Sequence, residues 1–491
     1  MHQFGMQEIA NTAWSFAQLA FVHVPLLHAL SRKAIASLRT GSVQNLTNTA
    51  WAFASIKFKN QTLFNSISAE AIPLISAFRQ QDLSIMAWSF ARREIRDDNL
   101  MYAIAASSIR LLSDGVGRPQ EIANLSWALS VLDLRHKPLL ESLAGAALRT
   151  QVHTFTPQEL ANTLWAFAGM KYRHEPLIES LASASLARIS QVTSQNLVNT
   201  AWALDALKWP AFHRDVVRSI LLRFTSCCEG SLGLEFVTLA SLAKERGILE
   251  EIPSFLEEFH VRILDPAVSG LRAIRHAEDD RTLAAEIKRF QDWVLKTQTP
   301  HLGEAFTVVV LEAAGTQIDA QDRSWTDKAR EAVGRVAWWS CPHAAVSSHG
   351  VVAWVVAHLQ VGDESVEEVG RVYFADDSAE HSILVERMLQ PIFLQASRNG
   401  HAERRALIDL LRAVAHAFKY HNSEAWSEVR GTVQLYASHF PCISCLVCIA
   451  QFCRRLCRVA LQVEFDNAWS AWAEAPVPIA SPDVLIMGSA A

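Results

Sequence analysis

The pattern of apolar and polar residues repeats over the first 210 positions with a period of 37 to 39 residues. The period is marked by a tryptophan that lies beside small alanines on an apolar stripe at helical spacing. A short break and a second apolar stripe follow it. The tryptophans are Trp14, Trp51, Trp88, Trp127, Trp165 and Trp202. This pattern predicts an α-solenoid of six stacked helix pairs, because one pair alone cannot bury its apolar face.

Three other positions of the period hold nearly constant residue types. Glutamine lies seven residues before each tryptophan, at Gln7, Gln44, Gln81, Gln120, Gln158 and Gln195. Asparagine lies three residues before it, except at Ile85, and the series is Asn11, Asn48, Asn124, Asn162 and Asn199. An aromatic or leucine follows two residues after it, at Phe16, Phe53, Phe90, Leu129, Phe167 and Leu204. We expect the large apolar residues to form the core and the amides to bridge neighbouring units.

This repeat resembles the octotricopeptide repeat, a helical pair found in organellar RNA-binding proteins. The resemblance covers residues 1–209 and implies single-stranded RNA as the ligand and a mitochondrion or plastid as the location. The solenoid pattern alone also fits a scaffold that binds other proteins. The N-terminus shows no targeting peptide and begins almost inside a repeat, so we expect that preceding sequence is missing.

One position of the repeat varies within a narrow polar set, as expected of a residue that contacts different bases. It lies six residues before each tryptophan, at Glu8, Asn45, Asp82, Glu121, Glu159 and Asn196. Such side chains suit hydrogen bonds to base edges, which makes them candidate RNA-binding residues. The same position is the third residue of a helix, where acids and amides cap backbone N–H groups. The sequence favours the capping interpretation.

Residues 210–340 lose the tryptophan period, although helical patterns continue, which predicts a helical bridge or degenerate repeats. Composition adds little to this picture. Hydrophobic residues make up 50% of the 491 residues and charged residues 19%, which fits a large folded core. The net charge of -5 does not indicate a nucleic-acid partner. No apolar run approaches the ~20 residues that a membrane span requires.

The residues that carry candidate chemistry lie near the C-terminus. His401-Ala402-Glu403 precedes Pro441-Cys442-Ile443-Ser444-Cys445, and Cys442 comes 41 positions after His401. His401 begins a predicted amphipathic helix, and the two cysteines begin another. Strands are predicted at 351–356, 371–374, 433–437 and 460–465. The sequence therefore predicts an α/β domain over 341–475 and a tail over 476–491.

This motif resembles that of the zinc-dependent nucleobase deaminases, H-x-E followed by P-C-x-x-C. The resemblance implies that His401, Cys442 and Cys445 hold Zn²⁺, whose fourth position is left open for a water with a lowered pKa. It implies that Glu403 does not bind zinc and instead carries protons from this water to the base. Little room remains after the last predicted strand for a further helix and strand.

Two other metal sites are compatible with the cysteines. Cys442, Cys445, Cys448 and Cys453 approach the spacing of an iron–sulfur run, but the last gap is too long and no proline follows. A structural zinc site could instead use His439. In the helical interpretation, Cys448, Cys453 and Cys457 are packing residues on one helix.

Together these patterns predict an RNA-binding solenoid joined to a deaminase, in which the tether places the enzyme beside an unpaired base. By analogy with plant editing factors that carry a DYW-type deaminase, conversion of cytosine to uracil is the first choice and adenine deamination the second. The alternatives are a non-catalytic RNA-stabilising factor and a protein-interaction scaffold. No membrane partner is expected.

Overall fold

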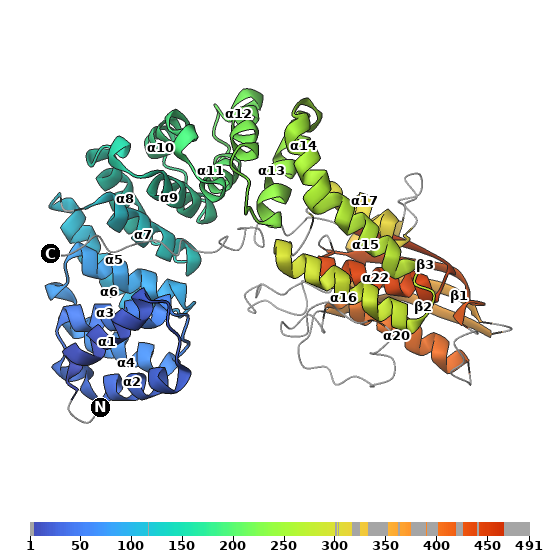
Figure 1. Cartoon of the computed structure of the whole chain (residues 1–491), viewed down its shortest axis with the longest axis horizontal. Helices are drawn as coiled ribbons and strands as arrows, with labels where there is room; N and C mark the ends of the chain where they lie inside the picture. Colours follow the sequence, from blue (N-terminus) through green and yellow to red (C-terminus); the bar gives the residue numbers. More distant parts are fainter. Residues whose placement is uncertain are drawn as a thin grey trace. The chain divides into compact units, whose positions relative to one another are not determined.

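The structure is a computed structural model that describes residues 4–115, 117–299, 302, 304–316, 325–331, 352–361, 364–374, 389, 401–418, 426–438 and 441–465. These residues fall into two compact units, of which one reaches Cys227 and the other begins at Cys228. The described part of the first unit contains helices only, and the second combines helices with a four-stranded sheet (Figure 1). The predicted solenoid followed by an α/β domain is confirmed. The predicted boundaries near 340 and 475 lie outside the described residues.

The first unit is built from six helix pairs. The helices that carry the tryptophans have 13 residues each and are α1 (Met6–Gln18), α3 (Val43–Ser55), α5 (Gln80–Arg92), α7 (Pro119–Val131), α9 (Pro157–Gly169) and α11 (Ser194–Ala206). Their partners are α2 (Val24–Ser37), α4 (Gln61–Ala71), α6 (Asp98–Ser113), α8 (Lys137–Arg149), α10 (Glu175–Ala187) and α12 (Arg214–Thr225). Short helical turns follow four of the partners, namely η1 (Leu38–Thr40), η2 (Ile72–Ala77), η3 (Val152–Thr154) and η4 (Ile189–Gln191).

The tryptophan helices form one continuous layer in which each packs on the next. In Figure 1, α7, α9 and α11 lie side by side along one edge of the first unit, and α8, α10 and α12 lie along the other. Indole rings from consecutive repeats meet in pairs, and the ring centres of Trp88 and Trp127 are 6.3 Å apart. Phe53 and Phe167 are fully buried. The predicted core role is confirmed for these phenylalanines and for Trp88, Trp127 and Trp165, which are buried. Trp14, Trp51 and Trp202 are only half-buried.

The tryptophan helices all end in the same left-handed turn. The residue six after each tryptophan has a positive φ, and the series is Ala20, Lys57, Glu94, Asp133, Lys171 and Lys208. In the second repeat, the N–H of Phe58 donates to the carbonyl of Phe53, and the N–H of Lys57 donates to the carbonyl of Ala54, both at 3.1 Å. This is the Schellman arrangement, in which apolar side chains on both sides of the turn touch. The Phe53 and Phe58 rings lie 5.7 Å apart, which explains the large apolar residue, phenylalanine or leucine, two residues after each tryptophan.

Most of the partner helices begin with a side-chain cap that the sequence analysis missed. The capping residues are His23, Asn60, Asp97, His136 and His174. In the fifth repeat, Nδ1 of His174 accepts a hydrogen bond from the backbone N–H of Leu177 at 3.3 Å. Each cap provides a partner for an N–H group that the helix itself cannot bond. The residue before most partner helices is therefore a further recurring feature of the repeat, and it is histidine, asparagine or aspartate.

The second unit opens with a helix that ends as the repeats do. Helix α13 (Gly233–Glu245) also has 13 residues and is followed by Gly247 with a φ of +63°. The N–H of Ile248 donates to the carbonyl of Ala243 at 3.0 Å, as in the Schellman turns of the first unit. Ser241 occupies the position of the tryptophan. Helix α13 thus shares its length and its C-terminal turn with the tryptophan helices, and both interpretations of the middle region, a helical bridge or degenerate repeats, stay predictions.

Further helices connect α13 to the sheet. They are η5 (Leu249–Glu251), α14 (Pro253–Phe259), η6 (His260–Leu264), α15 (Asp265–Arg275), α16 (Asp280–Thr297) and α17 (Glu304–Ala314). Helices α15 and α17 pack on α22 (Ile443–Arg455). Nε of Arg454 on α22 donates to the carbonyl of Ala277 at 2.8 Å. This middle segment therefore supports a helix of the α/β domain. None of the described helices combines the length and apolarity needed to cross a bilayer.

The sheet has the strand order β2-β1-β3-β4. Its strands are β1 (Val352–Val361), β2 (Glu364–Phe374), β3 (Arg430–Ala437) and β4 (Arg458–Phe465). Strand β1 pairs antiparallel with β2 and β3, while β3 and β4 are parallel and joined through α22. All four predicted strands are confirmed. A further helix and strand after β4 would lie outside the described residues.

Both faces of the sheet are covered by apolar contacts. Trp354 and Tyr436 lie opposite each other on one face, where the Trp325 ring stacks on Trp354 with 6.1 Å between the ring centres. The alternate residues Val355 and Leu435 point to the other face and are fully buried. Helix α20 (Ala402–Ala417) packs on β1 and β2. The buried sheet thus supports α20 by packing, and α20 in turn packs on α22.

Candidate metal centre

The candidate site is formed where α20 and α22 begin. His401 is the N-cap residue of α20, and Cys442 is the N-cap residue of α22. Cys445 lies one turn further along α22, so both thiols face the same side of the helix start. Helix α22 leads from β3 to β4, which places its first turn beyond the carboxyl end of a buried parallel strand. Two separate helices therefore supply the three side chains.

The three side chains converge closely enough to hold one metal ion. Nδ1 of His401 lies 3.2 Å from Sγ of Cys445 and 3.6 Å from Sγ of Cys442, and the two sulfurs are 3.7 Å apart. Tetrahedral zinc, with bonds of about 2.3 Å to sulfur and 2.0–2.1 Å to nitrogen, needs separations of about 3.8 Å and 3.5 Å. Two of the distances agree closely, and the third is a few tenths of an ångström short. We call these three residues the metal cluster.

Local electrostatics favour a thiolate in the metal cluster. The pKa of the Cys442 thiol is lowered well below its usual value, because Cys445 hydrogen-bonds to it and His401 adds hydrogen-bonding and charge stabilisation against the opposing effect of burial. The start of α22 contributes its partial positive charge in the same direction. Since a metal binds the deprotonated sulfur, this arrangement prepares the cluster for a cation.

Glu403 lies beside the cluster in the first turn of α20. Its side chain is 3% exposed, and Oε2 has no hydrogen-bond partner within the described ranges. Burial raises the pKa of its carboxyl group, an effect that His401 partly offsets. A buried oxygen without a partner costs about 1–3 kcal/mol. A water or ligand at the cluster would remove this cost, so the surroundings fit an ion with an open position.

The sequence analysis missed one charged residue next to the site. Arg404 follows Glu403 on α20, is 4% exposed, and donates from Nε to the carbonyl of Leu389 at 3.0 Å. A buried guanidinium needs such partners to offset the loss of water. The only signal in the sequence is its place beside Glu403, and charged residues in the first turns of a helix are usually exposed.

Among the described residues, the other cysteines near α22 do not extend the metal cluster. Cys448 and Cys453 are buried on α22, and burial raises the pKa of each to about 12, so both stay protonated. The group of converging ligands contains His401 and not these thiols, which argues against the iron–sulfur alternative. Placing Cys457 on the same helix as a packing residue was wrong. Helix α22 ends at Arg455, and Cys457 is exposed in the turn before β4. His439 lies outside the described residues.

The six candidate RNA-binding residues are the third residues of the tryptophan helices, as predicted. In five of them the side chain accepts a hydrogen bond from the backbone N–H of the residue before the helix, and these are Glu8, Asn45, Asp82, Glu121 and Glu159. In the fifth repeat, Oε2 of Glu159 accepts from the N–H of Thr156 at 2.7 Å. The exception is Asn196, whose own N–H donates to Oγ1 of Thr193. The capping interpretation is confirmed for five positions, and contact with RNA stays a prediction.

Residues 42–212 match the family model of the RNA-editing substrate-binding complex 6 protein. The matched range runs from the start of α3 past the end of α11 and contains five of the six tryptophan helices. It does not include the metal cluster. No curated protein matches the chain. The helical repeats are thereby linked to RNA editing through a comparison that is independent of the deaminase-like motif.

Within this RNA-editing-related region, buried polar atoms without partners gather on α5 and α7. They include both amide atoms of Gln80, Nε1 of Trp88, Oδ1 of Asn124 and Oγ of Ser126. The two helices are neighbours in the layer of tryptophan helices. The capping residues Asp82 and Glu121 have partners, so the unpaired atoms belong to other side chains of these helices and are candidates for completion by a ligand.

Proposed function

We propose that this chain is an RNA-binding protein that carries a zinc-dependent deaminase domain and converts cytosine to uracil in RNA. The observation that carries the proposal is the convergence of His401, Cys442 and Cys445 beside the buried carboxyl group of Glu403. The RNA-editing family match over the repeats supports the same process independently. Adenine deamination is the second choice, because the same residues would serve it.

In this proposal the metal cluster holds Zn²⁺, which when bound makes water a nucleophile at neutral pH. Glu403 takes a proton from the attacking water and delivers it to N3 of cytosine as a C–O bond forms at C4. A second proton goes to the 4-amino group, the C–N bond breaks, and ammonia leaves. Cytosine and water thus yield uracil and ammonia. Glu403 suits this task because it lies within the first turn of α20, beside the ligand His401.

The helical repeats would hold the RNA and raise the concentration of one unpaired base near the site. Their resemblance to octotricopeptide repeats supports single-stranded RNA as the ligand and an organelle, mitochondrion or plastid, as the location. The repeats have too little excess positive charge to attract RNA by charge alone. Base contacts would therefore supply a large share of the binding energy.

The test compares the purified full chain with Glu403→Gln and with a matched control, Asp409→Asn, which removes a carboxylate two turns later on the same helix. Zinc content is measured in each protein by elemental analysis. Each is then incubated with a single-stranded RNA pool, and released nucleosides are analysed by mass spectrometry. We expect about one zinc per chain in all three, and uridine formed from cytidine by the wild type and the control only.

Each other outcome selects another function. Inosine instead of uridine would assign adenine as the substrate. Zinc and RNA binding without product would identify a non-catalytic RNA-binding factor. A chain that binds no single-stranded RNA at moderate salt would be a protein-interaction scaffold. Equal product from the wild type and Glu403→Gln would remove the proposed catalytic role.

A further inference from the structure

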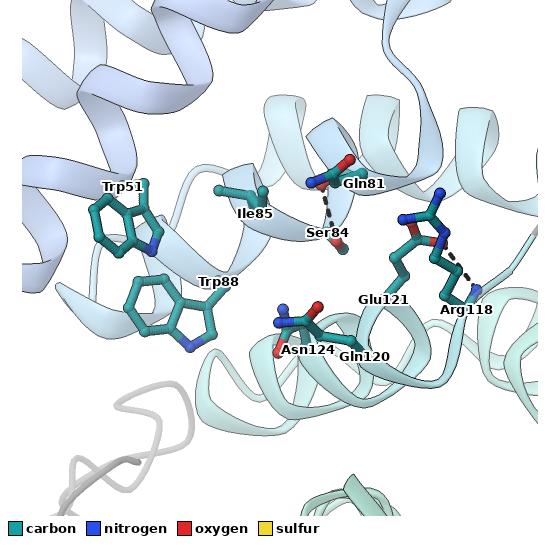
Figure 2. A pocket seen from close by; sticks show the side chains of 9 residues that line it. All are labelled: Trp51, Gln81, Ser84, Ile85, Trp88, Arg118, Gln120, Glu121 and Asn124. Carbon is teal, nitrogen blue, oxygen red and sulfur yellow. Dashed lines mark hydrogen bonds between the residues drawn. The ribbon is translucent and has the colours of Figure 1, made fainter. Parts of the chain in front are cut away.

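A pocket lies between α5 and α7 in the third and fourth repeats (Figure 2). It is a narrow hollow that is partly open to solvent. Trp51 and Trp88 close one end, and Arg118 and Glu121 lie at the other. Between them, α5 contributes Gln81, Ser84 and Ile85, and α7 contributes Gln120 and Asn124. The pocket therefore combines a flat aromatic end with a polar interior.

Two buried polar atoms of this pocket lack hydrogen-bond partners. They are the Nε1 donor of Trp88 and the Oδ1 acceptor of Asn124, and both residues are 6% exposed. No partner for either atom occurs in the described part of the chain. Each buried unpaired group costs about 1–3 kcal/mol, a cost that a ligand with a matching donor and acceptor would remove. The pocket thus presents one fixed donor and one fixed acceptor.

The break in the asparagine series falls in the repeat before the unpaired acceptor. Ile85 holds the position where the other five repeats have asparagine, and it lines the pocket with Asn124 of the next repeat. An isoleucine side chain cannot donate a hydrogen bond to the Asn124 carbonyl. Of the five asparagines in the series, Asn124 is the one whose buried Oδ1 lacks a partner among the described residues.

We infer that this pocket accepts an unpaired nucleobase of the bound RNA. A base is planar and can stack on an indole, and its edge carries both acceptors and donors for Trp88 and Asn124. Two charged residues, Arg118 and Glu121, line the pocket, and their opposite charges give no net charge. Glu121 already accepts a hydrogen bond from the backbone N–H of Arg118 at 2.9 Å. A neutral ring therefore fits the interior better than a phosphate. This inference rests on the proposed RNA binding by the repeats.

The test uses two variants of the full chain and a matched control. Asn124→Leu removes the acceptor, and Ile85→Asn introduces the residue of the other repeats, which can donate to Asn124. The control, Asn162→Leu, makes the same change in the next repeat, outside the pocket lining. A random single-stranded RNA pool is selected on the wild type. One selected RNA is then scanned by replacing each nucleotide in turn with an abasic one, and affinities are measured by fluorescence anisotropy.

We expect one abasic position to weaken wild-type binding at least about fivefold, since base stacking contributes about 1–3 kcal/mol. Both pocket variants should weaken binding of the intact RNA by a similar factor and lose sensitivity at that position. The control should keep it. If both variants match the wild type in affinity and abasic profile, RNA binding stands and the pocket inference is overturned. If the wild type selects no RNA, both proposals fail.

Photo-crosslinking gives a readout that does not depend on the variants folding. The selected RNA, with 4-thiouridine placed next to the sensitive position, is irradiated on the wild type, and the crosslinked peptides are mapped by mass spectrometry. Crosslinks within 80–92 or 119–131 support the inference. Crosslinks confined to other repeats overturn it, even where RNA binding itself is retained.

Discussion

The first turns of α9 and α20 both contain a buried or half-buried glutamate, but the two carboxyl groups differ in their bonding. Glu159 on α9 accepts a hydrogen bond from the backbone of its own N-cap residue. Glu403 on α20 has an oxygen without a partner in the described part of the chain and lies beside three converging side chains that could hold a metal ion. The acid in the repeat therefore stabilises a helix end, whereas the acid at the metal cluster remains available for chemistry.

The largest effect is expected from Glu403→Gln. Loss of a positioned proton carrier lowers rates by about 10²- to 10⁴-fold. Zinc content should be unchanged, and the free energy of unfolding should not fall, because the buried carboxyl lacks a full set of partners. The rate of uridine formation with saturating RNA gives the kinetic readout, and denaturation gives the stability. A large loss of stability would show that Glu403 is structural, as Glu159 is.

The next effect concerns the metal ligands. Cys442→Ser should reduce zinc content strongly, while Cys448→Ser should retain it, because Cys448 lies outside the metal cluster. A chelator should lower the unfolding temperature of the wild type and leave that of Cys442→Ser nearly unchanged. Bound ligand at 100 times its Kd stabilises by about 2.7 kcal/mol. Equal zinc content in the two variants would contradict the assignment.

Glu159→Ala tests the glutamate of the repeats in the way that Glu403→Gln tests the glutamate beside the metal cluster. Loss of the capping box should lower the free energy of unfolding by about 0.5–2 kcal/mol. The rate of deamination with saturating RNA should be unaffected. Chemical denaturation and the same kinetic assay give the two values. If Glu159→Ala lowered the rate of deamination and left the stability unchanged, the claim that Glu159 is purely structural would be contradicted.

Removal of the helix cap formed by His174 should also lower the stability of the repeats without affecting the rate of deamination. His174→Ala should lower the free energy of unfolding by about 1 kcal/mol, because the N–H of Leu177 loses its acceptor. His174→Asn should be nearly neutral, since asparagine holds the same position at Asn60 in the second repeat. Equal losses in both variants would show that the imidazole acts through packing rather than capping.

The smallest effect concerns the left-handed turns. Lys171 has a φ of +52°, which is unfavourable for a residue with a Cβ. Lys171→Gly should raise the free energy of unfolding by about 0.5–1 kcal/mol, and Gly247→Ala in the turn after α13 should lower it by a similar amount. Thermal melts of the two variants against the wild type would show opposite shifts. Shifts of the unfolding temperature in the same direction would contradict the conclusion that Lys171 and Gly247 adopt the same left-handed turn.

The sequence contained enough information to predict the repeat helices, the four strands and the three side chains that converge at the candidate metal centre. Helical and strand periodicities persist over many residues, and His401, Cys442 and Cys445 have a characteristic spacing. Other features depend on single residues or on contacts between repeats. The residue that caps the partner helices changes type along the repeats, from histidine to asparagine or aspartate. That Ile85 lies in the same pocket as Asn124 is visible only in the structure. Cys457 was placed on a helix because no proline or glycine marks the end of α22.

The central claim is that His401, Cys442 and Cys445 hold one zinc ion and leave a position open beside Glu403. X-ray absorption at the zinc edge of the purified full chain tests it most directly. The account predicts two sulfur neighbours at about 2.3 Å and lighter neighbours at about 2.0–2.1 Å, one of them an imidazole nitrogen. Four sulfur neighbours, or a protein that binds no zinc, would contradict it.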